Sequence, residues 1–399
     1  MKKRISALVL AMLFVLSALI GCGQSTKADD TTASADTNAS TEAKESESQT
    51  AEETASGTSV EAADVKIGVI TTLVKNDGGW CQAQYEGITG AMESVGLDTE
   101  TQLLFLENIA EEQSSVQAAV DQLVNEGCQI IFGASTGYAP ILSELALSYP
   151  DVYFAQVGDK VENIIGYQIR DYQAMYLCGY LMGLMSDSDE LGYSAGMSEA
   201  SVRRGINAFA LGAKAANPNA TVTVMWANSW YDIAAETECA NTLINMGIKY
   251  MGINASSPAI PEACEKAGAF CTGYHMDMKD RAPKAVTTSF EWNWAPIITD
   301  IIEQYMAGTL STDTYYFWGA DKDCARISDI NMDIVPQEVA DKVLEMKDKI
   351  ISGEIEVYDG GEEGLKDNKV NVLVAPGEIM SDEDIMSQMF LVENVKGEW

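Results

Sequence analysis

The sequence has little histidine and little positive charge. Its 399 residues include one histidine, and 25 lysines and arginines stand against 60 aspartates and glutamates, for a net charge of −35. A single histidine nearly excludes a serine–histidine–aspartate triad and metal sites built from several histidines. The acidic excess argues against binding of nucleic acid, which is itself a polyanion. Composition alone therefore disfavours two large classes of function.

Other signatures are also missing. The chain has no Walker loop, and no Gly-x-Gly-x-x-Gly follows its first expected strand. Seven of the eight cysteines lie beyond Cys22, an odd number without close metal-type spacing, so a disulfide framework is not expected. Cys264 and Cys271 could pair, but buried free thiols are the preferred interpretation. We expect neither an enzyme nor a cofactor, although paired carboxylates cannot be judged from sequence and leave a hydrolase open.

The first residues are typical of a bacterial lipoprotein. A basic start and an apolar run, Ile5–Ile20, precede Gly21 and Cys22. We expect residues 1–21 to be a signal peptide, and the resemblance to a lipobox predicts that Cys22 is the lipidated mature N-terminus. The alternative is plain cleavage with an ordinary cysteine. One acylated residue anchors a protein to a membrane surface without spanning the membrane.

The next stretch, 22–63, is rich in Thr, Ser, Ala, Glu and Asp and has no aromatic residue. It cannot bury a core, so we expect a disordered tether. Its role would be to hold the folded part away from the membrane.

From Asp64 onward, short apolar runs alternate with helical patterns. The alternation predicts an α/β fold with mostly parallel sheets and helices on both faces, and two rounds of similar length suggest two similar lobes. No element can be assigned to Gly353–Trp399. The expected strands are Val65–Ile70, Gln102–Leu106, Gln129–Phe132, Val152–Gln156, Ile164–Ile169, Leu191–Ser194, Thr221–Met225, Tyr250–Ile253, Phe270–Gly273 and Tyr315–Trp318. The expected helices are Glu111–Glu126, Ala139–Leu147, Tyr172–Met185, Ser201–Ala215, Ile233–Met246, Glu262–Ala267, Ile297–Met306 and Pro336–Ser352.

The loop after the first strand is the strongest candidate for a binding site. It carries Asp77, Gly78, Gly79 and Trp80 just before a helix, at the edge of the sheet where ligands bind in open α/β folds. Glycines allow a ligand to approach the backbone, and a helix start offers free amides. An aromatic face can stack on a flat ring. The alternative is that Trp80 only covers the helix against the sheet.

Other loops at expected carboxyl edges add candidates, each with a plainer alternative. Ser135 and Thr136 can bind a ligand or cap a helix, Asp159 can enter the cleft or cap a turn, and Trp230 stands on a loop with three aromatic residues. Asp232 is a reasonable cap for the helix that follows. Asp277 can accept hydrogen bonds from ribose or base, whereas the single histidine, His275, is expected at the surface or partly buried. Trp292 lies in Ser289–Trp294, which is expected to start a helix; it can wall a pocket or a hinge, or simply pack.

From about Val65 to the C-terminus, the chain resembles the basic membrane protein (Bmp or Med-type) lipoproteins. These are substrate-binding subunits of ABC transporters for purine nucleosides and related compounds. The order and spacing of several motifs carry the resemblance: Asn76-Asp-Gly-Gly-Trp80 with Tyr85-Glu-Gly87, Tyr149-Pro-Asp-Val-Tyr-Phe154, Tyr176-Leu-Cys-Gly179, Arg204-Gly-Ile-Asn-Ala-Phe209 with Gly212-Ala213, Asn217-Pro218, and Gly273-Tyr-His-Met-Asp277.

The resemblance implies a type I periplasmic-binding-protein fold with two Rossmann-like lobes joined by a hinge. In many members a phenylalanine stacks on a purine while acidic or amide residues bond the purine's edge; here Trp80, Asp77 and Asn76 stand at those positions. Cys81 replaces a common asparagine, and the lysine that often holds ribose has no match near Ser289–Trp294. A nucleobase such as adenine therefore gains weight over a nucleoside.

The resemblance also implies the arrangement of the chain and its partners. We expect lobe 1 to comprise 64–170 and 290–319, and lobe 2 to comprise 171–289 and 320–399, with the ligand captured between them. The expected partners are a purine, an ABC permease with its ATPase, and the membrane through the lipid anchor. The protein would act as a monomer on the extracytoplasmic face of the cell membrane. The alternatives are a sugar or another polar ligand for uptake or sensing, or a nucleoside-processing enzyme.

Overall fold

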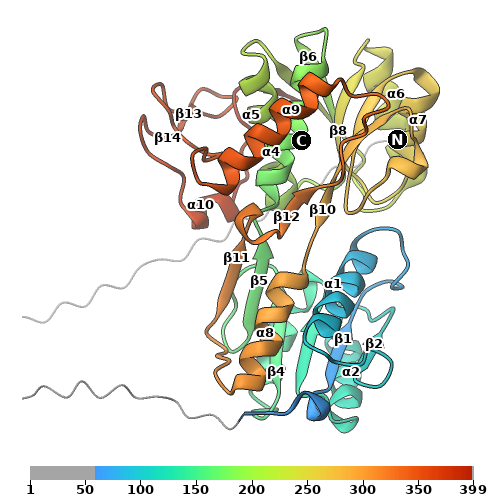
Figure 1. Cartoon of the computed structure of the whole chain (residues 1–399), viewed down its shortest axis with the longest axis vertical. Helices are drawn as coiled ribbons and strands as arrows, with labels where there is room; N and C mark the ends of the chain where they lie inside the picture. The colour runs from blue at the N-terminus through green and yellow to red at the C-terminus, as the bar shows by residue number, and fades with distance from the viewer. Residues whose placement is uncertain (1–58, 398–399) are drawn as a thin grey trace, which may run out of the picture. The chain divides into compact units, whose positions relative to one another are not determined.

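The computed structural model describes residues 59–397 of the chain. The expected signal peptide, the lipidation at Cys22 and nearly all of the expected tether lie outside these residues. Within them, the chain forms a six-stranded, a seven-stranded and a two-stranded sheet. Figure 1 shows the two large sheets with helices packed around them. The prediction of an α/β fold with mostly parallel sheets is confirmed.

The six-stranded sheet is parallel throughout, in the order β11-β5-β4-β3-β1-β2. Strand β1 is buried on both faces, because Val69 joins one hydrophobic core and Ile70 joins another. Burial on both faces explains the continuous apolar run that marks this strand in the sequence. The strands are β1 (Ile67–Ile70), β2 (Leu103–Leu106), β3 (Ile130–Gly133), β4 (Tyr153–Val157), β5 (Ile165–Ile169) and β11 (Tyr315–Trp318).

The seven-stranded sheet has the order β12-β10-β9-β8-β6-β7-β15. Its pairs are parallel except for β10 with β12, which is antiparallel. The strands are β6 (Glu190–Ala195), β7 (Thr221–Trp226), β8 (Tyr250–Asn254), β9 (Phe270–Gly273), β10 (Val286–Trp292), β12 (Ala325–Ile327) and β15 (Val395–Lys396).

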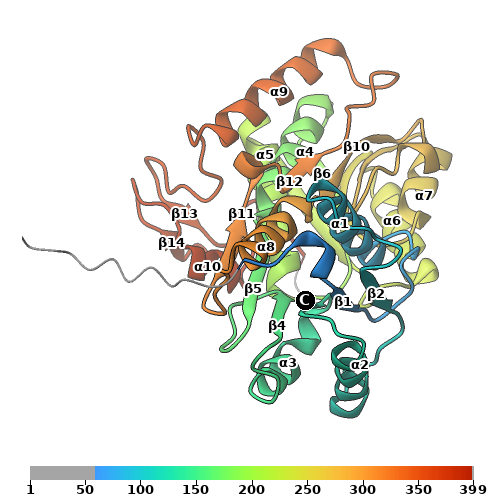
Figure 2. The ribbon, with the colours of Figure 1, turned by 60° about the horizontal axis from the view of Figure 1, so that its bottom comes forward.

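Helices cover both large sheets, and two helix pairs are especially close. Helices α1 and α8 lie side by side in both views (Figure 1 and Figure 2). Helices α4 and α5 meet through small residues: a Cβ atom at Gly179 would lie 1.9 Å from the carbonyl oxygen of Phe209, so only glycine fits there. The helices are α1 (Trp80–Ser94), α2 (Gln113–Asn125), α3 (Ala139–Ala146), α4 (Asp171–Met185), α5 (Ala200–Ala216), α6 (Ile233–Asn245), α7 (Ala259–Ala267), α8 (Ala295–Ala307), α9 (Gln337–Ile351) and α10 (Asp382–Met386).

The chain passes between the two large sheets three times. It leaves the six-stranded sheet after β5 through Arg170, returns between β10 and α8, and leaves again between β11 and β12. The expectation that Ser289–Trp294 starts a helix is wrong for most of this stretch, because β10 extends to Trp292 and α8 begins at Ala295. The threonines, phenylalanine and tryptophan of β10 favour a strand over a helix.

The C-terminal segment contains elements that the sequence did not indicate. Strands β13 (Leu365–Lys366) and β14 (Val372–Val374) pair with each other, and β15 extends the seven-stranded sheet beside β7. Side chains tie the segment to α5, since Asn207 donates to Gln388 at 2.8 Å. These elements are too short to show a helical or strand period, so local pattern could not reveal them.

Residues 59–397 contain all the cysteines beyond Cys22. These seven cysteines are free and buried, which confirms the preferred interpretation of Cys264 and Cys271 as thiols. Within residues 59–397, no helix has both the length and the apolar character of a membrane span.

Candidate functional site

The loop between β1 and α1 is organised by Asp77. The Asp77 carboxylate accepts hydrogen bonds from the backbone amides of Gly79 at 2.9 Å, Cys81 at 3.1 Å and Gln82 at 3.0 Å. Amides at the start of a helix lack partners within the helix, and a carboxylate there satisfies them. The donors that the sequence offered to a ligand are therefore occupied by Asp77. Asn76 is exposed.

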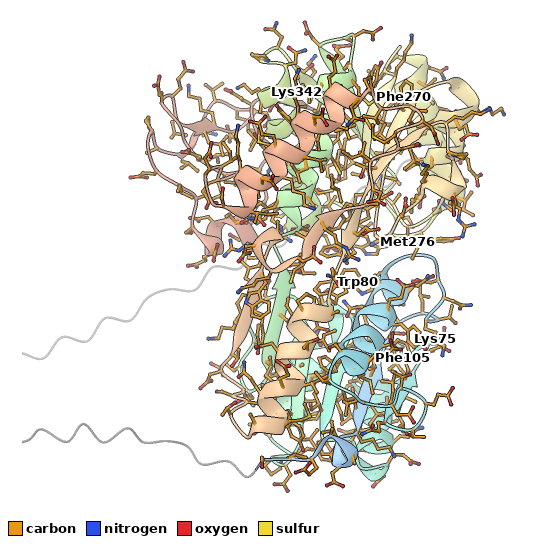
Figure 3. All side chains as sticks on the ribbon, in the orientation of Figure 1. Lys75, Trp80, Phe105, Phe270, Met276 and Lys342 are labelled. Atoms are coloured by element: carbon orange, nitrogen blue, oxygen red, sulfur yellow. The ribbon has the colours of Figure 1, made fainter. Side chains whose placement is uncertain are left out.

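Lys75, two residues before Asp77 in the same loop, contacts a side chain of α1. The Lys75 ammonium group lies 4.6 Å from the centre of the Tyr85 ring, and Tyr85 meets Phe105 edge to face at 5.2 Å. Figure 3 labels Lys75 and Phe105 at this position and Trp80 at the start of the same helix. The loop is thus fixed at one end by a cation–π contact and at the other by the Asp77 cap.

Three tryptophans form a cluster where the two large sheets are connected. Trp292 and Trp294 stack with ring centres 5.1 Å apart, and Trp80 meets them edge to face at 5.4 and 5.6 Å. The Trp80 indole N–H donates to the carbonyl oxygen of Ala134 at 2.7 Å. Trp80 therefore does more than cover its helix: it joins α1 to the end of β3 and to the strand that carries Trp292. Trp292 and Trp294 are buried.

His275 is part of the same cluster and is only 8% exposed, so the expectation of a surface or partly buried histidine is wrong. Its Nδ1 accepts a hydrogen bond from the Trp292 indole N–H at 2.9 Å, and its Nε2 lies 3.0 Å from the Ser256 hydroxyl. Burial lowers the pKa of His275 from 6.5 to about 4, against the opposing effect of the Asp77 charge. The imidazole is therefore neutral at ordinary pH.

A cavity of about 200 Å³ lies beside this cluster. Asp77 and Gly78 border it from the α1 loop, and loops of the seven-stranded half supply the rest. Of the ten predicted site residues, Asp77 and Asp277 line it. The other lining residues, which the sequence analysis did not propose, are Tyr231, Ser256, Pro258, Met276, Met278 and Arg281.

These unpredicted residues share a position in the fold. Ser256 follows β8, Met276 and Arg281 follow β9, and Tyr231 follows β7. The carboxyl ends of parallel strands were already the expected place for ligands, so the same criterion, applied to every loop, would have included them. Figure 3 shows Met276 on the loop that faces Trp80.

The other eight predicted residues do not line this cavity. Trp80 begins α1 and Trp292 ends β10, and both belong to the tryptophan cluster. Ser135 donates to Glu111, and Thr136 and Asp159 are exposed. Trp230 is 51% exposed, next to the cavity residue Tyr231. Asp232 caps α6, as expected, by accepting from two backbone amides of that helix.

The chemistry of the site is that of hydrogen-bond donors and acceptors. Ser135 lies in a Gly-x-Ser-x-Gly pattern, Gly133–Gly137, which in some hydrolases carries a catalytic serine beside a histidine. Here Ser135 donates to Glu111, and the single histidine forms its hydrogen bonds with Trp292 and Ser256. No group of three or more histidines, cysteines or carboxylates within residues 59–397 is placed to hold a metal ion. The cavity combines the Asp77 and Asp277 carboxylates, which accept hydrogen bonds, with donors on Arg281 and Ser256.

Comparison with known proteins agrees with this picture. A family model described as ABC transporter substrate-binding protein, PnrA-like, matches residues 64–360. The chain belongs to the Bmp family. A protein of Haloferax volcanii named putative ABC transporter glucose-binding protein is 30% identical to this Bmp-family chain over 376 residues, covering 93% of this chain and 89% of the relative. A purine-binding protein of Brucella abortus is 28% identical over 333 residues, covering 83% of this chain and 93% of the relative.

Solved structures show the same fold as this Bmp-family chain. An ABC transporter solute-binding protein from Conexibacter woesei aligns with a TM-score of 0.62 at 20% identity, over 73% of this chain and 98% of that one. A protein from Bacillus halodurans titled transcriptional activator of the comK gene aligns with a TM-score of 0.64 at 20% identity, over 73% and 99%. These structures show that the chain has the two-lobe fold of type I periplasmic binding proteins. Its membership of the Bmp family makes it an ABC transporter substrate-binding protein.

Proposed function

We propose that this protein captures a purine nucleobase or nucleoside between its two lobes and delivers it to a membrane permease. The observation that carries the proposal is the cavity beside the Trp80–Trp292–Trp294 cluster, with the Asp77 and Asp277 carboxylates on its wall. Carboxylates accept hydrogen bonds from the N–H groups of a purine, Arg281 donates to its ring nitrogens, and aromatic rings provide stacking faces.

A free base fits the site better than a nucleoside. The cavity volume of about 200 Å³ lies below the range of about 300–1,000 Å³ that is common for ligand pockets. A purine-binding relative covers most of the chain, which supports this ligand class. We assign Asn76, Gly79, Ser135, Thr136, Asp159 and Trp230 to the rim that approaches the ligand when the lobes close.

The lobes are proposed to follow the two large sheets. Lobe 1 would comprise 64–170 with α8 and β11, and lobe 2 would comprise α4 to β10 with the segment from η4 (Ala320–Lys322) onward. Ligand binding would close the lobes about the three connections, and the permease with its ATPase would recognise the closed form. We further propose that lipidated Cys22 anchors a monomer at the extracytoplasmic face of the membrane, and that the protein has no catalytic activity.

A thermal-shift screen of the purified protein tests the ligand class. Adenine, hypoxanthine, guanine and their nucleosides are compared with glucose and other sugars at equal concentration. A ligand present at a hundred times its dissociation constant stabilises the folded state by about 2.7 kcal/mol. The melting temperature of the protein therefore rises clearly. If no purine raises the melting temperature, purine capture is wrong. Release of base from adenosine or inosine during incubation would contradict the absence of catalysis.

Glucose is the second candidate, because the relative that is 30% identical is named a putative glucose-binding protein. Sites that combine aromatic rings with carboxylates also suit sugars, whose hydroxyl groups donate to carboxylates. In the same screen, stabilisation by glucose without stabilisation by any base would favour this candidate.

A further inference from the structure

The hydrogen-bonded chain Trp292–His275–Ser256 has a defined direction. An indole N–H can only donate, so His275 Nδ1, 2.9 Å from Trp292 Nε1, is an acceptor without a proton. The neutral imidazole then carries its proton on Nε2, which lies 3.0 Å from Ser256 Oγ. The histidine therefore donates to the serine oxygen.

This direction decides what Ser256 can do. Because its oxygen accepts from His275, the serine keeps its own hydroxyl proton for another partner. Within residues 59–397, His275 is the only group that shares a hydrogen bond with this hydroxyl. Ser256 also lines the cavity. The neighbouring Ser257 differs, since it is fully buried and donates to Glu236.

Ser256 also lies where the two halves of the protein meet. A Cβ atom at Gly79 would be 3.2 Å from the Ser256 Cβ and 3.5 Å from the His275 ring carbon Cδ2. The α1 loop therefore packs directly on the serine and histidine, and a larger residue at position 79 would press on both. The serine hydroxyl is thus confined between the His275 ring, the Gly79 backbone and the cavity.

We propose that the Ser256 hydroxyl donates a hydrogen bond to an acceptor atom of the bound ligand, and that His275, held by Trp292, is the positioning residue that orients it. The inference rests on the proposed function. It names the ligand atom that Ser256 contacts, which is a carbonyl oxygen or an unprotonated ring nitrogen. Asp77 and Asp277 accept from N–H groups of the same ligand. The site thus selects a small molecule that carries both hydrogen-bond donors and a hydrogen-bond acceptor.

A double-mutant cycle tests the proposal. Dissociation constants for adenine, hypoxanthine and guanine are measured by calorimetry with the parent, Ser256→Ala, His275→Asn and the double variant. Asparagine tolerates the left-handed backbone of His275, whose φ is 74°, and it is too short to reach Ser256. The control is Ser143→Ala on α3, whose hydroxyl donates to the Glu162 carbonyl oxygen away from the site.

Ser256→Ala is expected to weaken binding of the best nucleobase by about fivefold to tenfold, the effect of one lost hydrogen bond. His275→Asn should weaken binding as well. The double variant should bind no worse than Ser256→Ala, because both substitutions remove the same hydrogen bond between Ser256 and the ligand. The control should bind like the parent.

Two results would overturn the proposal: unchanged affinity in Ser256→Ala, or losses that add in the double variant, which is what a merely structural histidine predicts. If the parent binds no nucleobase, the proposed purine function fails, and the same cycle is run with glucose, whose oxygens are also acceptors. Loss on Ser256→Ala there would support the serine assignment alone. A parent that binds neither ligand overturns both proposals.

Discussion

Arg170 and Asp382 form a bidentate ion pair, in which Nη1 and Nη2 of the guanidinium each donate a hydrogen bond of 2.7 Å to one carboxylate oxygen. Arg170 lies on the connection from β5 to α4, and its Nε donates to the carbonyl oxygen of Phe317 on β11 at 2.9 Å. Asp382 opens α10, beyond residue 360, where the match to the Bmp family model ends. The C-terminal segment is thus tied to the first of the three connections between the sheets and, through Arg170, to strand β11.

Replacing Asp382 by Asn should weaken this tie. Exposed ion pairs contribute about 0.2–1 kcal/mol to the free energy of unfolding. The bidentate geometry places the Arg170–Asp382 pair at the upper end of this range. We expect Asp382→Asn to lower the free energy of unfolding by about 1 kcal/mol in urea titrations at low salt, and by less at high salt. Glu345→Gln, which removes the exposed pair with Lys349 on α9, is the control and should cost less. An equal loss in both variants would contradict a special role for Asp382.

Replacing Trp80 by Ala should weaken nucleobase binding by about tenfold or more. We propose that the ring stacks on the base when the lobes close, and stacking on an aromatic ring contributes about 1–3 kcal/mol. Calorimetric titration with the best base from the thermal-shift screen measures the loss. Trp80→Phe keeps an aromatic face but loses the hydrogen bond to Ala134, so it should retain most of the affinity. Unchanged affinity in Trp80→Ala would remove this side chain from the site.

Asp77 should matter for the stability of α1 as well as for the ligand. Its carboxylate caps three backbone amides, and loss of such a cap costs about 0.5–2 kcal/mol. Asp77→Ala should therefore lower the free energy of unfolding by about 1 kcal/mol, measured by urea denaturation without ligand, whereas Asp77→Asn keeps an acceptor and should lose less. If both variants unfold like the parent, the cap does not stabilise the helix.

Stability should fall as the pH falls from about 6.5 to about 4 because of His275. The folded-state pKa is about 4 and the ordinary value is 6.5, so in this window the unfolded chain binds more protons than the folded one, and the free energy of unfolding rises with pH. At about 1.36 kcal/mol for each pKa unit, the full difference is about 3 kcal/mol. Urea titrations at several pH values measure it.

The control for this pH dependence is His275→Gln, which cannot take up a proton. Asp77 faces the imidazole, and other carboxylates titrate in the same range, so the informative quantity is the difference between parent and variant. That difference should shrink steadily below pH 6.5. Parallel curves for the two proteins would show that His275 is not buried in its neutral form.

Much of the fold could be predicted from the sequence, and the failures have physical reasons. Runs such as Ile67–Ile70 mark strands that are buried on both faces. Ser289–Trp294 was expected to start a helix, yet its residues as far as Trp292 belong to strand β10, which pairs with β9 and β12. The C-terminal elements were missed because each is held by partners far away in the sequence.

Part of the candidate site could also be predicted from the sequence, and part of it could not. Local pattern was enough to place the Asp77–Trp80 loop and Asp277 at the carboxyl ends of strands, because strand, loop and helix are set by neighbouring residues. It could not show that Asp77 turns back to cap α1, that His275 is buried between Trp292 and Ser256, or that Arg281 lines the same cavity as Asp77. Those relations depend on side chains from different strands meeting in space, so only the tertiary structure decided them.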